Sequence, residues 1–217
     1  MTAEFAVRSV VSSPYGRAVM ATLEEKAADW ALKEMAFGES RLKSHLALHP
    51  FGRLPVLHHG QFTLYETQAI LRYLDRVLPE PLLTPDAPRA AARIDQLMGI
   101  NDSYLFCGCT NVIVFQRLIG PALLGKPADL AAISEAKPRA HVAFDDISRI
   151  LGSEDFLTGK GISLADLMIG AQLSLFSYTA EWDELTTGRD NLVAWVRRME
   201  ERPSFAKTRW KALVAGS

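Results

Sequence analysis

Four prolines between residues 79 and 88 constrain the fold of this 217-residue chain more than any other feature. The clusters Pro79-Glu80-Pro81 and Pro85-Asp86-Ala87-Pro88 stop any helix, because proline lacks an amide hydrogen and clashes with the preceding turn. The residues before this stretch mix strand-like and helix-like patterns, whereas those after it show helical periodicity alone. We therefore expect an α/β domain over residues 1–80, a linker over 81–88 and an all-α domain over 89–217.

The residues before the first proline cluster alternate between strand and helix patterns. Phe5 to Val11 is apolar and β-branched, and Ser12-Ser13-Pro14 follows it with residue types that start a helix. Two later apolar runs flank His59-Gly60, which predicts a β-hairpin. The expected strands cover residues 5–11, 30–37, 54–57 and 62–65, and the expected helices cover residues 17–26 and 70–78.

One helix start in the C-terminal part is specified unusually well. Ser163 is the expected N-cap and Asp166 stands at the third helical position, which makes an acidic capping box. Ile162 and Leu167 flank this box as a hydrophobic staple. The helix that follows is apolar on nearly all sides, so we expect it at the centre of the helical domain.

The charges of the chain nearly cancel. Lys and Arg number 24 against 25 Asp and Glu, and residues 1–80 alone carry 9 of each sign. Neither part has the positive field that a phosphate backbone attracts, so we expect no nucleic-acid partner. A hydrophobic content of 48% also excludes extended disorder.

Two cysteines exclude a disulfide scaffold and favour a reducing, cytoplasmic location. Cys107 and Cys109 are expected to be small core residues of one helix, pointing to different faces. No apolar run approaches the ~20 residues that span a bilayer. The first residues lack the basic and uninterrupted apolar regions of a signal peptide. We therefore expect no membrane partner.

The histidines do not predict a metal site. His45 and His49 lie four residues apart, and His58-His59 follow. The glutamate of an H-E-x-x-H motif is missing, and Pro50 interrupts a helix that would present the first pair. We therefore expect no metal cofactor.

Three motifs stand out in the first domain: the corner Ser12–Val19, the segment His49–Leu57 and the segment Leu64–Ile70. Together they resemble motifs of the cytosolic glutathione S-transferases. The second is similar to the family's Asn-Pro-Phe-Gly-x-Val-Pro pattern, with His and Leu in place of Asn and Val. The third is similar to Glu-Ser-x-Ala-Ile, with Thr in place of Ser. Residues 161–167 stand where the family's buried sixth helix begins, so the resemblance covers nearly the whole chain.

This resemblance implies a thioredoxin-like N-terminal domain joined to an all-helical domain, usually in a homodimer. It also implies glutathione as co-substrate and a transfer of its thiolate to small apolar electrophiles. Alternatives are a glutathione-dependent isomerase or peroxidase, and a non-catalytic binding or scaffold protein. A thiol–disulfide oxidoreductase is disfavoured, because the corner holds Ser, Pro and Tyr where such an enzyme needs cysteine.

The resemblance assigns the catalytic hydroxyl to one of two serines. The thiolate is the nucleophile, and a hydroxyl at a helix N-terminus can stabilise it by a hydrogen bond. Ser13 stands four residues before Arg17, as in theta- and phi-type members, whereas a zeta-type corner selects Ser12. From the residues alone, both serines are equally explained as turn and N-cap residues.

The resemblance also assigns the groups that hold glutathione. Leu54-Pro55 is similar to the family's cis-proline pair, which leaves the Leu54 backbone free to pair with the peptide. Glu66-Thr67 stands at a helix start that favours a carboxylate. Ser40 and Arg41 occupy the positions of a His-Lys pair in phi-type members, and Arg53 replaces a frequent Gln or Lys. The residues alone also suit an ordinary trans proline, a helix cap and solvated arginines.

Two aromatic residues complete these expectations. We expect the electrophile between the domains, lined by Tyr15, and we expect the aromatic residues of the following domain to be mainly core. Phe51 stands where several family members insert an aromatic side chain into the partner subunit, so we expect a dimer contact there.

Overall fold

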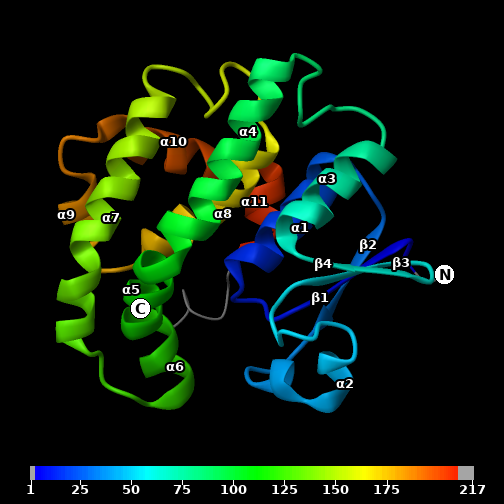
Figure 1. Ribbon diagram of the computed structural model, residues 1–217, viewed down its shortest axis with the longest axis horizontal. Helices are drawn as coiled ribbons and strands as arrows, with labels where there is room; N and C mark the ends of the chain where they lie inside the picture. The colour runs from blue at the N-terminus through cyan, green and yellow to red at the C-terminus, as the bar shows by residue number, and fades with distance from the viewer. Residues whose placement is uncertain (1–2, 210–217) are drawn as a thin grey trace. The chain divides into compact units, whose positions relative to one another are not determined.

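Figure 1 shows the computed structural model, which describes residues 3–209. Two compact units are formed: one from the described residues up to Leu82 together with those from Pro203 on, the other from Leu83 to Arg202. The first unit is α/β and the second is helical, apart from an isolated bridge between Phe156 and Gly159. The expected fold class is therefore confirmed.

A four-stranded mixed sheet forms the centre of the first unit. Its strand order is β2-β1-β3-β4, with β1 (Phe5–Ser9) parallel to β2 (Trp30–Glu34) and antiparallel to β3 (Val56–His59). β3 pairs antiparallel with β4 (Phe62–Tyr65), which is the expected hairpin. Side chains along β1 alternate between buried and half-buried, as a strand covered on one face requires.

Two helices lie side by side against this sheet, α1 (Pro14–Glu25) and α3 (Thr67–Val77) (Figure 1). A buried ion pair joins them, because Lys26 after α1 lies 2.7 Å from the Asp75 carboxylate of α3. The short elements η1 (Glu39–Arg41) and α2 (Lys43–Leu46) connect β2 to β3.

The last described helix, α11 (Pro203–Lys207), packs on α1. Arg17 of α1 is buried, donates a hydrogen bond of 2.9 Å to the Phe205 carbonyl and lies 4.6 Å from the centre of its ring. The sequence placed these residues in the helical domain at 89–217, whereas the structure groups α11 with the first unit. The reason is the set of contacts between α11 and α1, which includes that of Arg17 with Phe205 and the Lys207–Glu24 ion pair, and which no local pattern signals.

The second unit is built around α8 (Leu164–Phe176), all of whose residues are buried. The capping box at its start is confirmed: the Ser163 hydroxyl accepts from the Asp166 N–H, and the Asp166 carboxylate accepts from the Ser163 N–H. That carboxylate also accepts hydrogen bonds from the Leu157 N–H at 2.8 Å and the Trp195 indole N–H at 3.0 Å. Burial raises the pKa of Asp166, and these hydrogen bonds oppose the rise.

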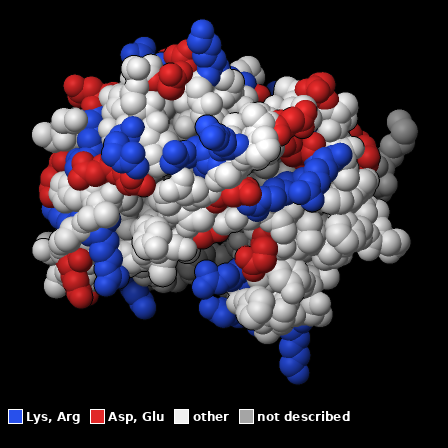
Figure 2. Space-filling view, turned by 45° about the horizontal axis from the view of Figure 1, so that its top comes forward, with Lys and Arg blue, Asp and Glu red and all other residues white. Residues whose placement is uncertain are grey.

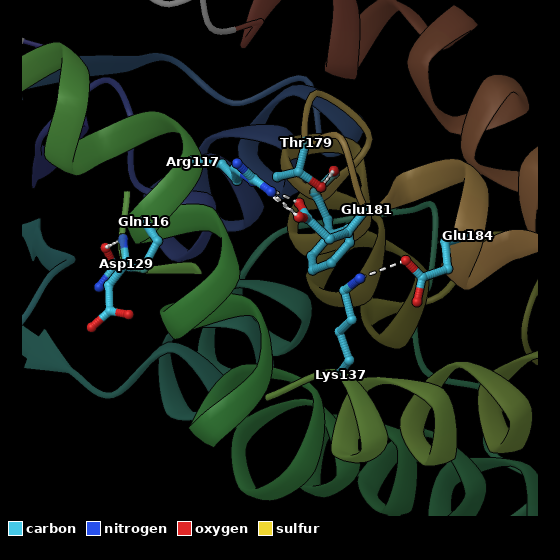
Figure 3. Close-up of polar contacts among 8 residues, drawn as sticks. Gln116, Arg117, Asp129, Lys137, Thr179, Glu181 and Glu184 are labelled. Carbon is cyan, nitrogen blue, oxygen red and sulfur yellow. Dashed lines mark hydrogen bonds and ion pairs between the residues drawn. The ribbon is translucent and has the colours of Figure 1, made fainter. Parts of the chain in front are cut away.

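The remaining helices of this unit follow in chain order. They are α4 (Pro88–Ile100), η2 (Asn101–Thr110), α5 (Asn111–Val114), η3 (Phe115–Ile119), α6 (Gly120–Leu124), α7 (Leu130–Leu151), α9 (Trp182–Thr186) and α10 (Asp190–Glu201). Polar contacts tie several of them together (Figure 3). Arg117 of η3 donates two hydrogen bonds to one oxygen of the buried Glu181, at 2.9 and 2.5 Å, and Lys137 of α7 pairs with Glu184 of α9.

A kink interrupts η2 at Cys107 and Gly108, where the backbone leaves the helical conformation. It turns the Cys107 side chain out to solvent, while Cys109 is buried and burial raises the pKa of its thiol to about 12. The expectation that both cysteines are core residues is therefore wrong for Cys107. The helical period assumed for this segment does not continue through Gly108, whose φ is 76°.

The helical stretch Pro88–Leu124 is long and apolar enough to cross a membrane by length and composition, with a mean hydropathy of 1.3 over 18 residues. No apolar run of this length was expected from the sequence. The kink at Cys107 and Gly108 divides the stretch, and parts of it pack against α7 and α8 within the unit. Core helices pass the same test of length and composition, so the test alone assigns this stretch no membrane role.

The charged side chains of both signs are interspersed over the face drawn in Figure 2. This distribution matches the formal net charge of −1. No single-sign patch extends across that face.

Candidate active site

The strand register brings three of the expected site segments to one end of the sheet. Arg8 near the end of β1 pairs with Val56 at the start of β3, and Val56 pairs with Tyr65 at the end of β4. The chain therefore leaves β1, enters β3 and leaves β4 at the same end. Leu54-Pro55 directly precede β3 and Glu66-Thr67 directly follow β4, whereas Ser12-Ser13 follow the end of β1 after two further residues.

Ser13 caps helix α1. Its Oγ accepts a hydrogen bond of 3.1 Å from the Gly16 N–H, so the capping role is present. This bond leaves the hydroxyl hydrogen available for another acceptor, and the side chain is half-buried at the positive end of α1. Ser12 is also half-buried, and its side chain makes no hydrogen bond within residues 3–209.

Gly16 is a residue of this corner that the sequence reasoning missed. A Cβ atom at this position would lie 2.2 Å from the Ser9 Oγ and 2.9 Å from the Ser9 Cβ. Glycine therefore allows the first turn of α1 to approach β1 closely. A glycine directly before the expected helix of residues 17–26 is the signal that the sequence offers for such a contact.

The Leu54–Pro55 peptide bond is cis, as the resemblance implies. The Leu54 N–H and carbonyl form no hydrogen bond within the described residues, and the β3 ladder begins only at Val56. One backbone donor and one acceptor are thus left at this end of the sheet. A peptide ligand can pair with them as an added strand does.

Glu66 and Thr67 form the start of α3. Glu66 has a φ of 71° and a ψ of 111°, a conformation that residues other than glycine rarely adopt, and its side chain is exposed. The first helical hydrogen bond runs from the Ile70 N–H to the Glu66 carbonyl, so the helix ladder does not use the Thr67 N–H. The positive end of α3 therefore suits a carboxylate, next to a carboxylate side chain that suits a cation.

Gly52 lies close to Ser40 and Arg41, and Arg53 is the next residue of its own segment. A Cβ on Gly52 would lie 3.0 Å from the Ser40 carbonyl and 3.4 Å from a guanidinium nitrogen of Arg41, and the φ of Gly52 is 61°. Both arginines are exposed, and neither forms an ion pair within the part of the chain that the structure describes. The expected basic residues are thus brought near one another and remain available to an anion. Sequence reasoning did not assign Gly52 this role.

The first histidine pair belongs to this segment. His45 is fully buried between the Arg8 side chain and the Arg53 carbonyl, and His49 is buried against the ring of Tyr65, with centroids 4.6 Å apart. Burial lowers the pKa of His49, and the charge of Glu66 opposes this effect. Within residues 3–209, no three metal-binding side chains are grouped.

The two aromatic residues expected at contacts differ in exposure. Phe51 is 65% exposed, and its ring meets those of His49 and Tyr65 edge to face. Tyr15, the second residue of α1, is half-buried.

Comparisons with known proteins agree with this arrangement. The family model "Glutathione S-transferase, N-terminal domain" matches residues 4–76, and "Glutathione S-transferase, C-terminal domain" matches residues 131–198. Glutathione S-transferase F14 of Arabidopsis thaliana is 32% identical over 198 residues, which are 88% of this chain and 77% of that protein. Probable glutathione S-transferase GSTF2 of Oryza sativa subsp. japonica is 30% identical, over 87% of each chain.

Solved structures show the same fold. A theta class glutathione S-transferase from Xanthomonas axonopodis pv. citri, solved with glutathione bound, superposes with a TM-score of 0.84 at 25% identity, covering 98% of this chain and all of that one. Glutathione transferase F7 from Populus trichocarpa gives a TM-score of 0.84 at 25% identity, over 94% and 97% of the two chains. With both family models matched and relatives aligned over most of its length, the chain belongs to the glutathione S-transferase family.

Proposed function

We propose that this transferase joins the sulfur of glutathione to a small apolar electrophile, and that it binds glutathione at the end of the sheet described above. The observation that carries this proposal is the unpaired Leu54 backbone beside the positive end of α3. The Leu54 backbone can pair with a peptide ligand as a neighbouring strand does, and the positive end of α3 can bind the carboxylate of that peptide.

Each part of glutathione meets a group of suitable chemistry in this proposal. The Leu54 N–H and carbonyl pair with its cysteine residue, with Pro55 fixing the turn. The start of α3 with the Thr67 hydroxyl binds the γ-glutamyl carboxylate, and Glu66 binds the neighbouring ammonium. Ser40, Arg41 and Arg53 surround the glycyl carboxylate, which matches two arginines that lack carboxylate partners in the described chain.

Ser13 activates the thiol in this proposal. A free thiol with a pKa near ~8.5 is only a few per cent ionised at neutral pH. The Ser13 hydroxyl donates a hydrogen bond to the sulfur, and the positive end of α1 adds to its effect. The thiol proton leaves to solvent, the thiolate forms a bond to the electrophilic carbon, and the leaving group departs with the electron pair of the broken bond. Tyr15, on the first turn of α1, is proposed to contact the electrophile.

We also propose that the protein is a cytoplasmic homodimer that acts in detoxification. Phe51 supports the dimer, because a largely exposed aromatic ring held by two neighbouring rings is a typical interface anchor. Light scattering at micromolar concentration tests it: the wild type should run as a dimer, and Phe51→Ala should shift mass toward the 24.0 kDa monomer. A wild type that remains monomeric contradicts this proposal.

The pH–rate profile with a generic aromatic halide tests the chemistry. Ser13→Ala should lower turnover at neutral pH about tenfold or more, since a hydrogen bond to a charged acceptor contributes ~1.5–3 kcal/mol. The activity should partly return at higher pH, and the dissociation constant of glutathione should change little. Ser12→Ala is the matched control.

Three outcomes would favour another catalytic residue or another function. A shifted profile in Ser12→Ala alone assigns the role to Ser12. Binding of glutathione without turnover of any electrophile favours a scaffold protein. Turnover of peroxides or of isomerisable substrates in preference to halides favours the peroxidase or isomerase alternative.

A further inference from the structure

His45 is hydrogen-bonded through both ring nitrogens. Its Nε2 lies 2.8 Å from the Arg53 carbonyl oxygen, and its Nδ1 lies 3.3 Å from the Arg8 Nε. An arginine Nε can only donate and a carbonyl can only accept. The two contacts are therefore compatible with one state of the ring, the neutral tautomer with its hydrogen on Nε2.

The imidazole links the sheet to the segment before Pro55. Arg8 belongs to β1, where its backbone is in register with Val56 of β3. Residues 53–55 precede that ladder and have no strand partner of their own. The bond from His45 to the Arg53 carbonyl thus ties this segment to the buried side of α2 and, through Arg8, to the sheet.

Because a peptide group is planar, the direction of the Arg53 carbonyl also fixes the direction of the Leu54 N–H. The Arg53 carbonyl and the Leu54 N–H belong to the same peptide group, which is trans, so the two bonds point in opposite directions within one plane. Holding the carbonyl toward His45 directs the Leu54 N–H away from it. That N–H has no partner within residues 3–209.

We propose that His45 is a positioning residue for glutathione, which orients the Leu54 N–H through the Arg53 carbonyl. This inference rests on the proposed function, in which Leu54 pairs with the cysteine residue of the peptide. His45 bonds to neither Ser13 nor any group assigned to the sulfur. It therefore sets the affinity for glutathione and leaves the ionisation of the bound thiol unchanged.

Substitution of His45 separates these two effects. His45→Phe keeps a planar ring and removes the donor, and should raise the glutathione dissociation constant and KM about tenfold. The kcat at saturating glutathione and the pH of half-maximal rate should stay unchanged. His45→Gln, whose amide nitrogen reaches about as far as Nε2, should restore most of the affinity.

His58→Phe is the matched control. His58 is a half-buried histidine of β3 whose Nδ1 bonds to the Thr63 hydroxyl, and it has no bond to residues 53–55. It should lose a comparable hydrogen bond and leave glutathione affinity unchanged. Calorimetric titration with glutathione and steady-state kinetics with an aromatic halide measure both variants, after melting curves show that they are folded.

The outcomes distinguish this inference from the function on which it rests. A wild type that binds no glutathione overturns the proposed function. A wild type that binds it, with a folded His45→Phe of equal affinity or with a kcat effect in place of the KM effect, overturns the role of His45 alone. If His45→Phe does not fold, Arg8→Met replaces it: this variant removes the donor that holds Nδ1 of the ring, so weaker glutathione binding is expected, and nitrogen NMR of the wild type should show the Nε2–H tautomer. An Nδ1–H tautomer in the wild type, or unchanged binding in Arg8→Met, contradicts the inference.

Discussion

Replacing Glu66 by glycine should make the protein more stable and weaken its binding of glutathione. The φ of 71° and ψ of 111° at Glu66 cost a residue with a Cβ about 1–3 kcal/mol, which glycine avoids. Glycine gains more freedom in the unfolded chain, which costs about 0.5–1 kcal/mol. The exposed Glu66 side chain forms no hydrogen bond or ion pair within residues 3–209 that would be lost. We therefore expect a net gain of about 1 kcal/mol.

A gain of this size should raise the melting temperature by about 2–4 °C for a chain of this length. The same substitution removes the carboxylate proposed to bind the ammonium of glutathione. An exposed charge pair contributes up to about 1 kcal/mol, so the dissociation constant should rise by about three- to fivefold. Scanning calorimetry without ligand and calorimetric titration with glutathione measure the two effects, at one fixed protein concentration because the protein is proposed to dimerise.

Two control variants separate strain from charge. Ala27 follows α1 with a φ of 50° and lies in no segment assigned to glutathione, so Ala27→Gly should raise the melting temperature and leave the affinity unchanged. Glu66→Gln keeps the backbone strain and loses the charge, so it should weaken binding without a gain in stability. A Glu66→Gly variant that melts below the wild type refutes the strain argument, and unchanged affinity removes Glu66 from the site.

Three further predictions concern stability. Ser163→Ala should lower the free energy of unfolding by about 1 kcal/mol, because it removes a helix cap. Asp166→Ala should lower it by about 3 kcal/mol or more, because it also leaves two buried N–H donors without an acceptor. Equal losses in urea unfolding would contradict this additional role of Asp166. Gly16→Ala should destabilise the protein by about 1–3 kcal/mol, because the new methyl group would clash with Ser9. Adding Ser9→Gly should recover part of this loss. An unchanged melting temperature in Gly16→Ala would show that a methyl group fits at this corner. Burial holds the pKa of His49 below its ordinary 6.5, so the native state binds a proton at this ring less readily than the unfolded state does. The free energy of unfolding that this difference contributes is present above pH 6.5 and is lost as the pH falls below it. His49→Asn should therefore lose less melting temperature than the wild type between about pH 8 and about pH 5, and parallel curves would exclude His49 as a source of acid sensitivity.

The sequence predicted best those features that depend on neighbours in the chain. The capping box at Ser163 and the hairpin around Gly60 follow from residue types a few positions apart, and both are present. Periodicity failed at Cys107, since a left-handed glycine next to it redirects the helix. Element types were therefore predictable from local chemistry, and local exceptions to a period were not.

The contacts between distant residues could not be predicted in this way. The four-residue spacing of His45 and His49 raised only the question of a metal site, which the missing glutamate and Pro50 disfavoured. In the structure, His45 bonds to Arg8, which lies 37 residues away, and to a backbone carbonyl that carries no side-chain signal. The resemblance to a family supplied the site segments, whereas the geometry that supports them came from the sheet register and from buried side chains.

The contact between Arg17 and Phe205 also constrains how the protein is made. The two residues are 188 positions apart, so at about 5–20 residues per second roughly 10 to 40 s separate their synthesis. Throughout that interval the nascent first unit exposes the surface of α1 that α11 later covers. The complete unit can form only after Phe205 has left the ribosome. A fragment that ends at Leu82 would remain in this unfinished state permanently.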